Sequence, residues 1–334
     1  PRLHAEQLVD VQDFSFLNGT NAFSIIKSLI AGKGVKLCTV ADSRMESNNK
    51  VSRKVKKLER VDRFLYDERG SNDLHLGWPF VQGKLSDDTV VRCPLLFFPV
   101  VLVQQQGYWV LKLREDAGIT FNKSFLLTYA QSNALKPDEE LLEHSFDDFD
   151  EDSTVFRTQL YQLLKDKLEV NFNTELFTDE LKPFEEFKRT DFEKQHQQGI
   201  LKLQQQAVLG IFPQAGSQLV PDYLTLIENN PSLQVETFFE ERTQAGTSTL
   251  SLKEENIFTP LEIDEWQEHA VKQAKIGRSL VIQGPPGTGK SQLIGNLISD
   301  AIATGKRVLL VCQKRVALDV VHERLSKLGL KNFI

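Results

Sequence analysis

The chain has 334 residues, of which 40% are hydrophobic and 26% are charged, and its formal net charge at pH 7 is −6. These values predict a soluble globular protein of roughly two or three domains and exclude a uniformly basic coat for nucleic acid. No apolar run approaches the roughly 20 residues of a membrane span. No signal peptide opens the chain, and its three cysteines lack CxxC spacing, so we expect a cytoplasmic protein without a disulfide framework.

Residues 1–250 have the mixed pattern of an N-terminal α+β accessory domain. Apolar side chains spaced by three and four residues over 23–30 predict a short amphipathic helix that ends near Gly32 and Gly34. The same spacing predicts an amphipathic helix at 50–63, whose other face carries seven lysines and arginines. Two interpretations of that face stay open: a solvated charged surface, or a surface that contacts the phosphates of a nucleic acid.

Residues 74–113 are typical of β-structure. Alternating apolar residues predict a first strand that is broken by Pro79. A near-continuous apolar run then predicts a buried strand that is interrupted at Pro99. A hairpin is expected across 104–107, because β-rich runs flank a short segment that contains glycine.

Two groups of side chains in the accessory domain leave alternatives open. Tyr108 and Trp109, which follow the hairpin turn, either pack within the sheet or stack on nucleic-acid bases. The acidic residues at 138–152 either form a solvated loop and helix start or bind a metal. The polar segment at 241–256 is the predicted boundary between the two domains.

From residue 257 onward the pattern becomes that of a nucleotide-binding domain. A capping pattern at Thr259 predicts a helix through Lys275. Short β-rich runs at 279–283 and 307–312 are each followed by a helical pattern. A strand–helix–strand–helix order with apolar strands predicts a parallel sheet with right-handed crossovers.

The sequence GPPGTGKS follows the first of these β-rich runs and matches the P-loop pattern G-x-x-x-x-G-K-[ST] at every fixed position. Its glycines let successive backbone N–H groups point inward, and these donors with a helix N-terminus favour a polyphosphate. Lys290 is the predicted catalytic residue on the β- and γ-phosphates of ATP, and the Ser291 hydroxyl is the predicted Mg²⁺ ligand. The predicted nucleotide-binding residues here are Gly284, Pro285, Pro286, Gly287, Thr288, Gly289, Lys290, Ser291 and Gln292.

Residues 261–330 resemble superfamily 1 helicases, closest to the branch with the nonsense-mediated-decay helicases and the Okazaki-fragment-processing helicase–nuclease. Gln267 stands where that family keeps its Q-motif glutamine, which implies recognition of the adenine edge by an amide that donates and accepts. The alternative is an ordinary surface glutamine. The sequence VLLVCQKRVALDVVHERL resembles motif Ia, whose exit loop contacts single-stranded nucleic acid. Here that loop carries Lys314 and Arg315, which depart from the small polar residues usual in the family, so phosphate contacts and solvent-facing cations both stay open.

The resemblance implies an α/β fold class, with residues 257–334 forming the start of a RecA-like P-loop parallel sheet. It also implies an ATP hydrolase that acts on single-stranded nucleic acid, DNA being favoured over RNA. The Walker B pair of such a motor is expected downstream of Ile334, so the chain is expected to be an N-terminal fragment that hydrolyses ATP poorly. The stretches LHLGWPFV, CPLLFFPVVLV and LGIFPQAGSQLVPDY in the preceding region resemble the N-terminal domain of large bacterial helicase-like proteins, which implies no specific chemistry. A protein-remodelling ATPase and a non-enzymatic N-terminal binding module are the alternatives.

Overall fold

The computed structural model divides into two compact units. Unit 1 comprises Pro1–Leu65 and Ser71–Pro231, and unit 2 comprises Ser232–Ile334 with Tyr66–Gly70. The predicted boundary at 241–256 lies, apart from its last residue, outside the described residues. The structure describes residues 8–42, 44–144, 146, 149–165, 167–168, 170–171, 177–185, 196–230, 256–285 and 287–334.

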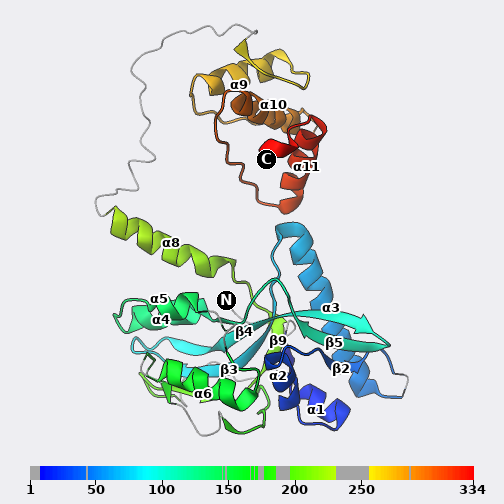
Figure 1. The fold of residues 1–334 in the computed structure, drawn as a ribbon, viewed down its shortest axis with the longest axis vertical. Helices are drawn as coiled ribbons and strands as arrows, with labels where there is room; N and C mark the ends of the chain where they lie inside the picture. The colour runs from blue at the N-terminus through cyan, green and yellow to red at the C-terminus, as the bar shows by residue number, and fades with distance from the viewer. Residues whose placement is uncertain are drawn as a thin grey trace. The chain divides into compact units, whose positions relative to one another are not determined.

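Unit 1 is built on a curled sheet, which the described residues form from nine strands in the order β1-β9-β3-β4-β5-β2, with β6, β7 and β8 off this path (Figure 1). The pairs are antiparallel except β7 with β8. The strands are β1 (Leu8–Asp10), β2 (Val35–Thr39), β3 (Leu74–Lys84), β4 (Val90–Gln105), β5 (Tyr108–Leu113), β6 (Thr120–Phe121), β7 (Val170–Asn171), β8 (Leu201–Gln204) and β9 (Val208–Ile211).

The central strands β3 and β4 run through the prolines that were predicted to interrupt them. β3 continues past Pro79, and β4 continues past Pro99, which pairs with His75. Those two predicted breaks are therefore wrong. Only alternate residues of an antiparallel strand donate to a given neighbour, so a proline need not end the ladder. β3 is buried along most of its length because it lies between β4 on one side and β8 and β9 on the other.

The predicted hairpin is confirmed as β4 and β5. Gln106 and Gly107 both have positive φ at its tip (51° and 79°), the backbone that a tight two-residue hairpin turn requires. Trp109 is buried, and its Nε1 donates to Ser52 Oγ at 3.0 Å, so the packing interpretation holds for this residue. Tyr108 is half-exposed, with the Lys36 ammonium 4.8 Å from its ring centroid.

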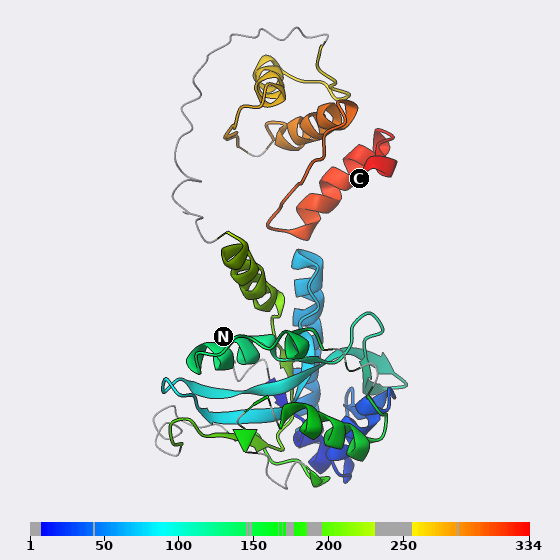
Figure 2. The same cartoon turned by 60° about the vertical axis from the view of Figure 1, so that its left-hand side comes forward.

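Helices cover both faces of this sheet: α4 and α5 lie over one, and α1, α2 and α6 lie over the other (Figures 1 and 2). The predicted helix at 23–30 is confirmed as α2. The predicted amphipathic helix at 50–63 is confirmed as part of α3, whose apolar residues face the core. No described helix has both the length and the apolar character that crossing a membrane requires. The helices of unit 1 are α1 (Asp13–Asn18), α2 (Phe23–Ile30), α3 (Glu46–Arg69), α4 (Lys123–Ser132), α5 (Glu139–Glu143), α6 (Ser153–Leu164) and α8 (Ala215–Asn229).

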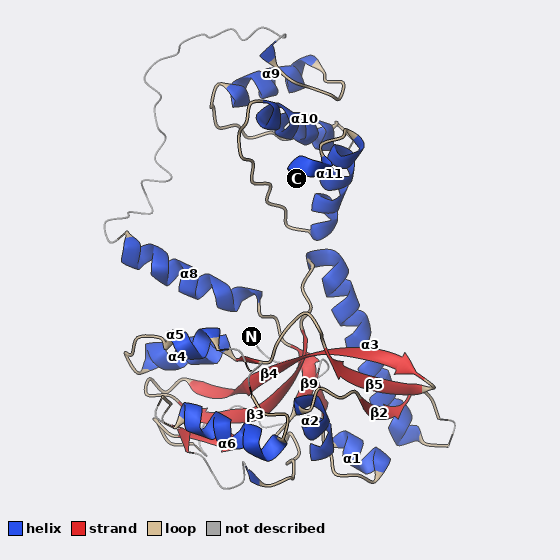
Figure 3. Ribbon diagram, in the orientation of Figure 1, coloured by secondary structure: helices blue, strands red, loops and turns tan. Residues whose placement is uncertain are grey.

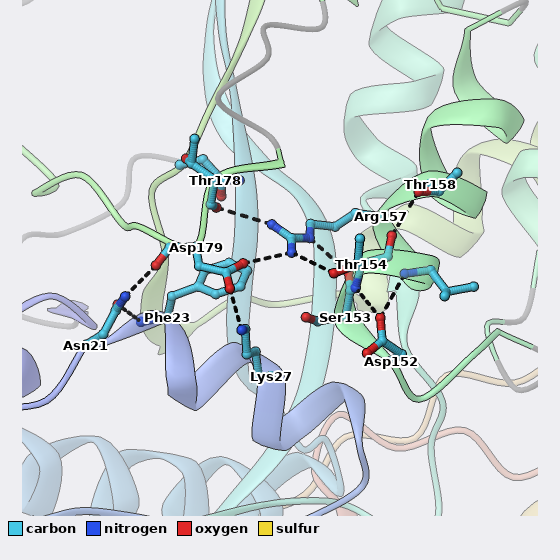
Figure 4. Close-up of polar contacts among 12 residues, drawn as sticks. Asn21, Phe23, Lys27, Asp152, Ser153, Thr154, Arg157, Thr158, Thr178 and Asp179 are labelled. Carbon is cyan, nitrogen blue, oxygen red and sulfur yellow. Dashed lines mark hydrogen bonds and ion pairs between the residues drawn. The ribbon is translucent and has the colours of Figure 1, made fainter.

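A polar network around Arg157 joins α2, α6 and the segment at 177–185 (Figure 4). The buried guanidinium donates to Asp179 Oδ1 at 2.8 Å and to the carbonyl oxygen of Ser153 at 2.9 Å, and it lies 4.9 Å from the ring centroid of Phe23. Asp179 also accepts from the Lys27 ammonium. Lys27 and Arg157 together hold the pKa of the Asp179 carboxyl below its usual range. A buried cation needs such partners, so we interpret this network as structural.

The acidic run at 138–152 supplies helix caps. Asp138 Oδ1 accepts from Leu141 N at 3.0 Å at the start of α5, and Asp152 Oδ1 accepts from Thr154 N at 2.8 Å at the start of α6. Among the described residues, no group of three or more His, Cys, Asp or Glu is arranged to hold a metal. The capping contacts of Asp138 and Asp152 fit the helix-start interpretation.

Unit 2 contains helices joined by extended loops (Figure 3). Ile298 of one helix packs against Val321 and Leu325 of the next, and these residues form a small buried cluster. The predicted helix at 316–328 is confirmed as α11. The helices are α9 (Glu265–Lys275), α10 (Lys290–Ala303), α11 (Arg315–Lys327) and a short 3₁₀ turn at Lys331–Phe333.

The predicted parallel strands of unit 2 are not formed in the described residues. Neither 279–283 nor 307–312 belongs to a sheet, and Val281, Leu309 and Val311 are 89%, 87% and 79% exposed. The sheet that the described residues form lies in unit 1 and is almost wholly antiparallel. A parallel strand is stable only where neighbouring strands pair with it and helices cover both faces, and the described part of unit 2 does not supply that surrounding.

Candidate functional site

The P-loop residues lead directly into α10, which begins at Lys290. Gly287 and Gly289 have φ values of 89° and 73°, a left-handed backbone that side chains disfavour. A Cβ atom on Gly284 would lie 2.6 Å from Thr288 Oγ1. These positions therefore require glycine, and they let the loop curl tightly in front of the helix. Pro286, another predicted nucleotide-binding residue, lies outside the described residues.

The loop is closed by contacts among its own residues. The Lys290 ammonium donates to the carbonyl oxygens of Gly284 and Pro285, and Thr288 Oγ1 donates to the carbonyl oxygen of Pro285 at 2.9 Å. Lys290 is thus aimed back across the opening of the loop. A cation on flexible methylenes can exchange carbonyl partners for phosphate oxygens, which carry more negative charge.

The two residues after Lys290 differ in what they contact. Ser291 is the second residue of α10 and is half-buried. The Gln292 side chain donates through Nε2 to the carbonyl oxygen of Glu262 at 2.5 Å, so the structure uses it to attach α10 to the segment before α9. The predicted role of Gln292 in nucleotide binding stays a prediction.

Gln267 lies beside the P-loop, although it precedes Gly284 by 17 positions in the sequence. Its Nε2 donates to the carbonyl oxygen of Thr288 at 3.3 Å, and a Cβ atom on Gly289 would approach that nitrogen to 2.7 Å. The helix that carries Gln267 begins later than predicted, because Asp264 rather than Thr259 is its cap and accepts from Gln267 N at 2.8 Å. The glutamine therefore sits in the first turn of α9, with its amide at the loop.

Two buried polar residues of α10, which sequence reasoning missed, hold this arrangement together. Asn296 accepts from Leu261 N and donates to the Leu261 carbonyl oxygen, both at 3.0 Å. Asp300 accepts from Phe258 N at 2.9 Å and from the Lys275 ammonium at 2.6 Å. The available signal was a pair of polar residues four positions apart on an otherwise apolar helix face.

The geometry of the loop fits a polyphosphate. Positive partial charge at the start of α10, the Lys290 ammonium and inward-curling backbone all favour an anion, and the first turn of α10 carries no acidic residue. The glycine at position 284 also keeps the loop free of a side chain that would collide with its own Thr288. The residues present therefore fit the phosphates of a nucleotide.

Lys314 and Arg315 lie where α11 begins. Lys314 is the N-cap residue of α11 and Arg315 is its first residue, and both are exposed. The Arg315 guanidinium lies 3.8 Å from Asp319 Oδ2, one turn along the helix. Nothing in this geometry tests a contact with nucleic acid, which stays a prediction.

Two protein-family models match the chain. Residues 262–332 match a family described as an AAA domain, and residues 37–128 match a family described as a protein of unknown function. The second match covers α3, β3, β4 and β5 of unit 1. No solved structure matches the chain.

Curated relatives extend the match across both units. An uncharacterized ATP-dependent helicase of Mycoplasma pneumoniae is 30% identical over 276 residues, which is 78% of this chain and 23% of that protein. A second, from Mycoplasma genitalium, is 29% identical over 83% of this chain and 24% of its own length. Regulator of nonsense transcripts 1 of Caenorhabditis elegans is 35% identical over 71 residues, or 21% of this chain and 7% of that protein.

The chain thus spans about a quarter of the length of the two mycoplasma relatives. These comparisons confirm the resemblance to the superfamily 1 helicase branch: residues 262–332 carry an AAA domain, and over most of its length the chain is homologous to ATP-dependent helicases.

Proposed function

We propose that unit 2 binds ATP with Mg²⁺ at residues 284–291 and that this binding serves a helicase or translocase acting on single-stranded nucleic acid. The observation that carries the proposal is the pairing of two elements at one place. A glycine-shaped loop with Lys290 opens α10, and the Gln267 amide is hydrogen-bonded to the same loop at Thr288. The loop that would hold the phosphates and the Gln267 amide, which can pair with adenine, therefore lie next to each other.

Each side chain has a distinct part in the proposed complex. The Lys290 ammonium leaves the carbonyl oxygens of Gly284 and Pro285 and binds phosphate oxygens. The Ser291 hydroxyl contributes one ligand to Mg²⁺, which typically takes few protein ligands and otherwise binds water and phosphate. Mg²⁺ held there would supply neutralisation of the phosphate charge. Gln267 exchanges the Thr288 carbonyl for adenine.

The nucleic-acid part of the proposal rests on the relatives and on the motif Ia resemblance. Both mycoplasma relatives are named ATP-dependent helicases, which favours this function over protein remodelling. Lys314 and Arg315 are the proposed phosphate contacts, and we favour DNA over RNA as the strand.

Replacing Lys290 tests the nucleotide site. We expect Lys290→Ala to weaken ATP·Mg²⁺ binding by at least about 100-fold, because a charge-assisted contact of ~3 kcal/mol or more is lost. Isothermal titration calorimetry measures this directly. Lys306→Ala is the matched control, since it removes an exposed lysine of the same unit just beyond the end of α10. Unchanged affinity in Lys290→Ala would contradict the proposed site.

A further inference from the structure

Helix α3 concentrates positive charge on the face that points away from the core of unit 1. Between residues 50 and 63 it carries seven lysines and arginines and two acidic residues, in a chain whose net charge is −6. Val51, Val55 and Leu58 are buried against the domain, whereas all seven cations are exposed. Arg53, Lys57, Arg60 and Phe64 follow one another at spacings of four, three and four residues, so they share the outward face of the helix.

The two acidic residues of this stretch do not neutralise that face. Glu59 forms an ion pair with Arg63, four residues along the helix. Asp62 turns inward, where its Oδ1 accepts from Asp73 N at 3.1 Å and from Leu74 N at 3.0 Å. Among the described residues, no acidic side chain forms an ion pair with Lys50, Arg53, Lys56 or Arg60.

We propose that this exposed basic face of α3 binds the phosphate backbone of a single-stranded nucleic acid. The stretch from Lys50 to Arg63 spans about 20 Å at 1.5 Å per residue, a straight row of cations of the kind that a linear polyanion can follow. Phe64 is 61% exposed at the end of the row and offers a ring on which an unpaired base can stack. Bases of a duplex are already stacked, which is why the single strand is favoured.

Other anionic partners fit this face less well. An amphipathic helix that binds a membrane inserts its apolar face between lipids, but the apolar face of α3 is buried in the core of unit 1. A protein interface needs a desolvated apolar centre, and Phe64 is the single exposed large hydrophobic residue between 50 and 65. The site lies in the region that matches a family of unknown function, and it stands on the charge of α3 independently of the nucleotide site.

A triple substitution of the whole chain tests this inference. Arg53→Gln, Lys56→Gln and Arg60→Gln together remove three cations while keeping long polar side chains on an exposed helix face. Binding is measured by fluorescence anisotropy with a labelled oligothymidylate of about 20 nucleotides, without ATP, between about 0.05 and 0.2 M salt. Three lost phosphate contacts are expected to lower affinity on the order of 100-fold at about 0.1 M salt and to reduce the log–log salt slope by about 2.

Two further variants make the result specific. Lys33→Gln, Lys165→Gln and Lys202→Gln remove the same charge from other exposed positions of unit 1, and this control is expected to stay within about twofold of the unmodified chain. Phe64→Ala is expected to cost roughly tenfold through lost stacking. Circular dichroism checks that each variant is folded.

The outcomes separate this inference from the nucleotide site. Equal losses in the two triple variants, or no loss in the α3 variant, would overturn it. So would an α3-dependent affinity for phosphatidylserine-containing phosphatidylcholine vesicles or for polyglutamate that matches or exceeds the affinity for the oligonucleotide. The α3 variant is expected to keep its affinity for ATP·Mg²⁺, and Lys290→Ala to keep its affinity for the oligonucleotide, so failure at one site leaves the other standing.

Discussion

At the scale of single residues, Gln267 is the side chain that would let the site recognise the base of a nucleotide and not only its phosphates. Its amide bonds to Thr288 of the loop in this structure and, in the proposed complex, to adenine. We expect Gln267→Ala to lower ATP affinity about tenfold, because one or two hydrogen bonds of about 1 kcal/mol each are lost, and to change GTP affinity much less. Competition of each nucleotide against a fluorescent ATP analogue measures both.

Gln273→Ala is the control for that comparison, because Gln273 lies on the same helix and accepts from Arg278. Equal losses of ATP and GTP affinity in Gln267→Ala would show that the residue only supports the loop.

His75 gives unit 1 a defined dependence on pH. Burial lowers its pKa from 6.5 to about 4, and its Nδ1 lies 3.0 Å from the carbonyl oxygen of Asp73. Between these two pH values the unfolded chain binds a proton that the folded chain does not, so the free energy of unfolding falls as the pH falls. The full difference is about 3 kcal/mol. Urea titrations from pH 7 to pH 4 measure it.

We expect the free energy of unfolding of His75→Gln to lose most of this dependence on pH between pH 7 and pH 4. Burial raises the pKa values of Asp10 and Asp62, which act in the opposite direction and are present in both proteins. The difference between the two proteins therefore isolates the histidine. Parallel curves for both would show that His75 titrates normally in the fold.

At the scale of elements, α10 is attached to the chain before α9 mainly through side chains that are polar and buried. We expect Asn296→Leu to lower the free energy of unfolding of unit 2 by about 2–4 kcal/mol, because both backbone groups of Leu261 lose their partner. Chemical denaturation measures the change. Asn332→Leu, at an exposed position, is expected to stay within about 0.5 kcal/mol. Similar losses in both would mean that the amide contact contributes little.

The helices of this protein could be predicted from the sequence much better than the strands of unit 2 or the polar contacts of the site. α2, α3 and α11 bury apolar residues on one face, and that periodicity is visible without a structure. The P-loop pattern and Gln267 could be singled out as candidates because their proposed chemistry demands fixed residue types. The run at 307–312 is rich in residues that favour strands, but such a segment forms a strand only where neighbouring strands pair with it. Asn296 was missed because its structural role is a pair of hydrogen bonds with Leu261, which lies 35 residues away in the sequence.

At the scale of the whole molecule, the two units have separate hydrophobic clusters, one spread over Val9–Ile211 and a small one around Ile298. We therefore expect two unfolding transitions in scanning calorimetry. ATP·Mg²⁺ at about 100 times its dissociation constant is expected to stabilise only the transition of unit 2, by about 2.7 kcal/mol. Lys290→Ala is expected to remove that shift. A single transition, or a shift of both, would contradict independent folding of the units.

The exposed runs at 280–282 and 308–311 bear on how the chain behaves in concentrated solution. Their side chains are apolar, and their backbone belongs to no sheet in the described residues. Extended apolar segments of this kind are what a strand of another copy adds to, since such pairing satisfies backbone groups and covers side chains at once. We therefore expect these two short segments, rather than net charge, to limit the solubility of the chain, and we expect a lysine placed in either segment to raise it.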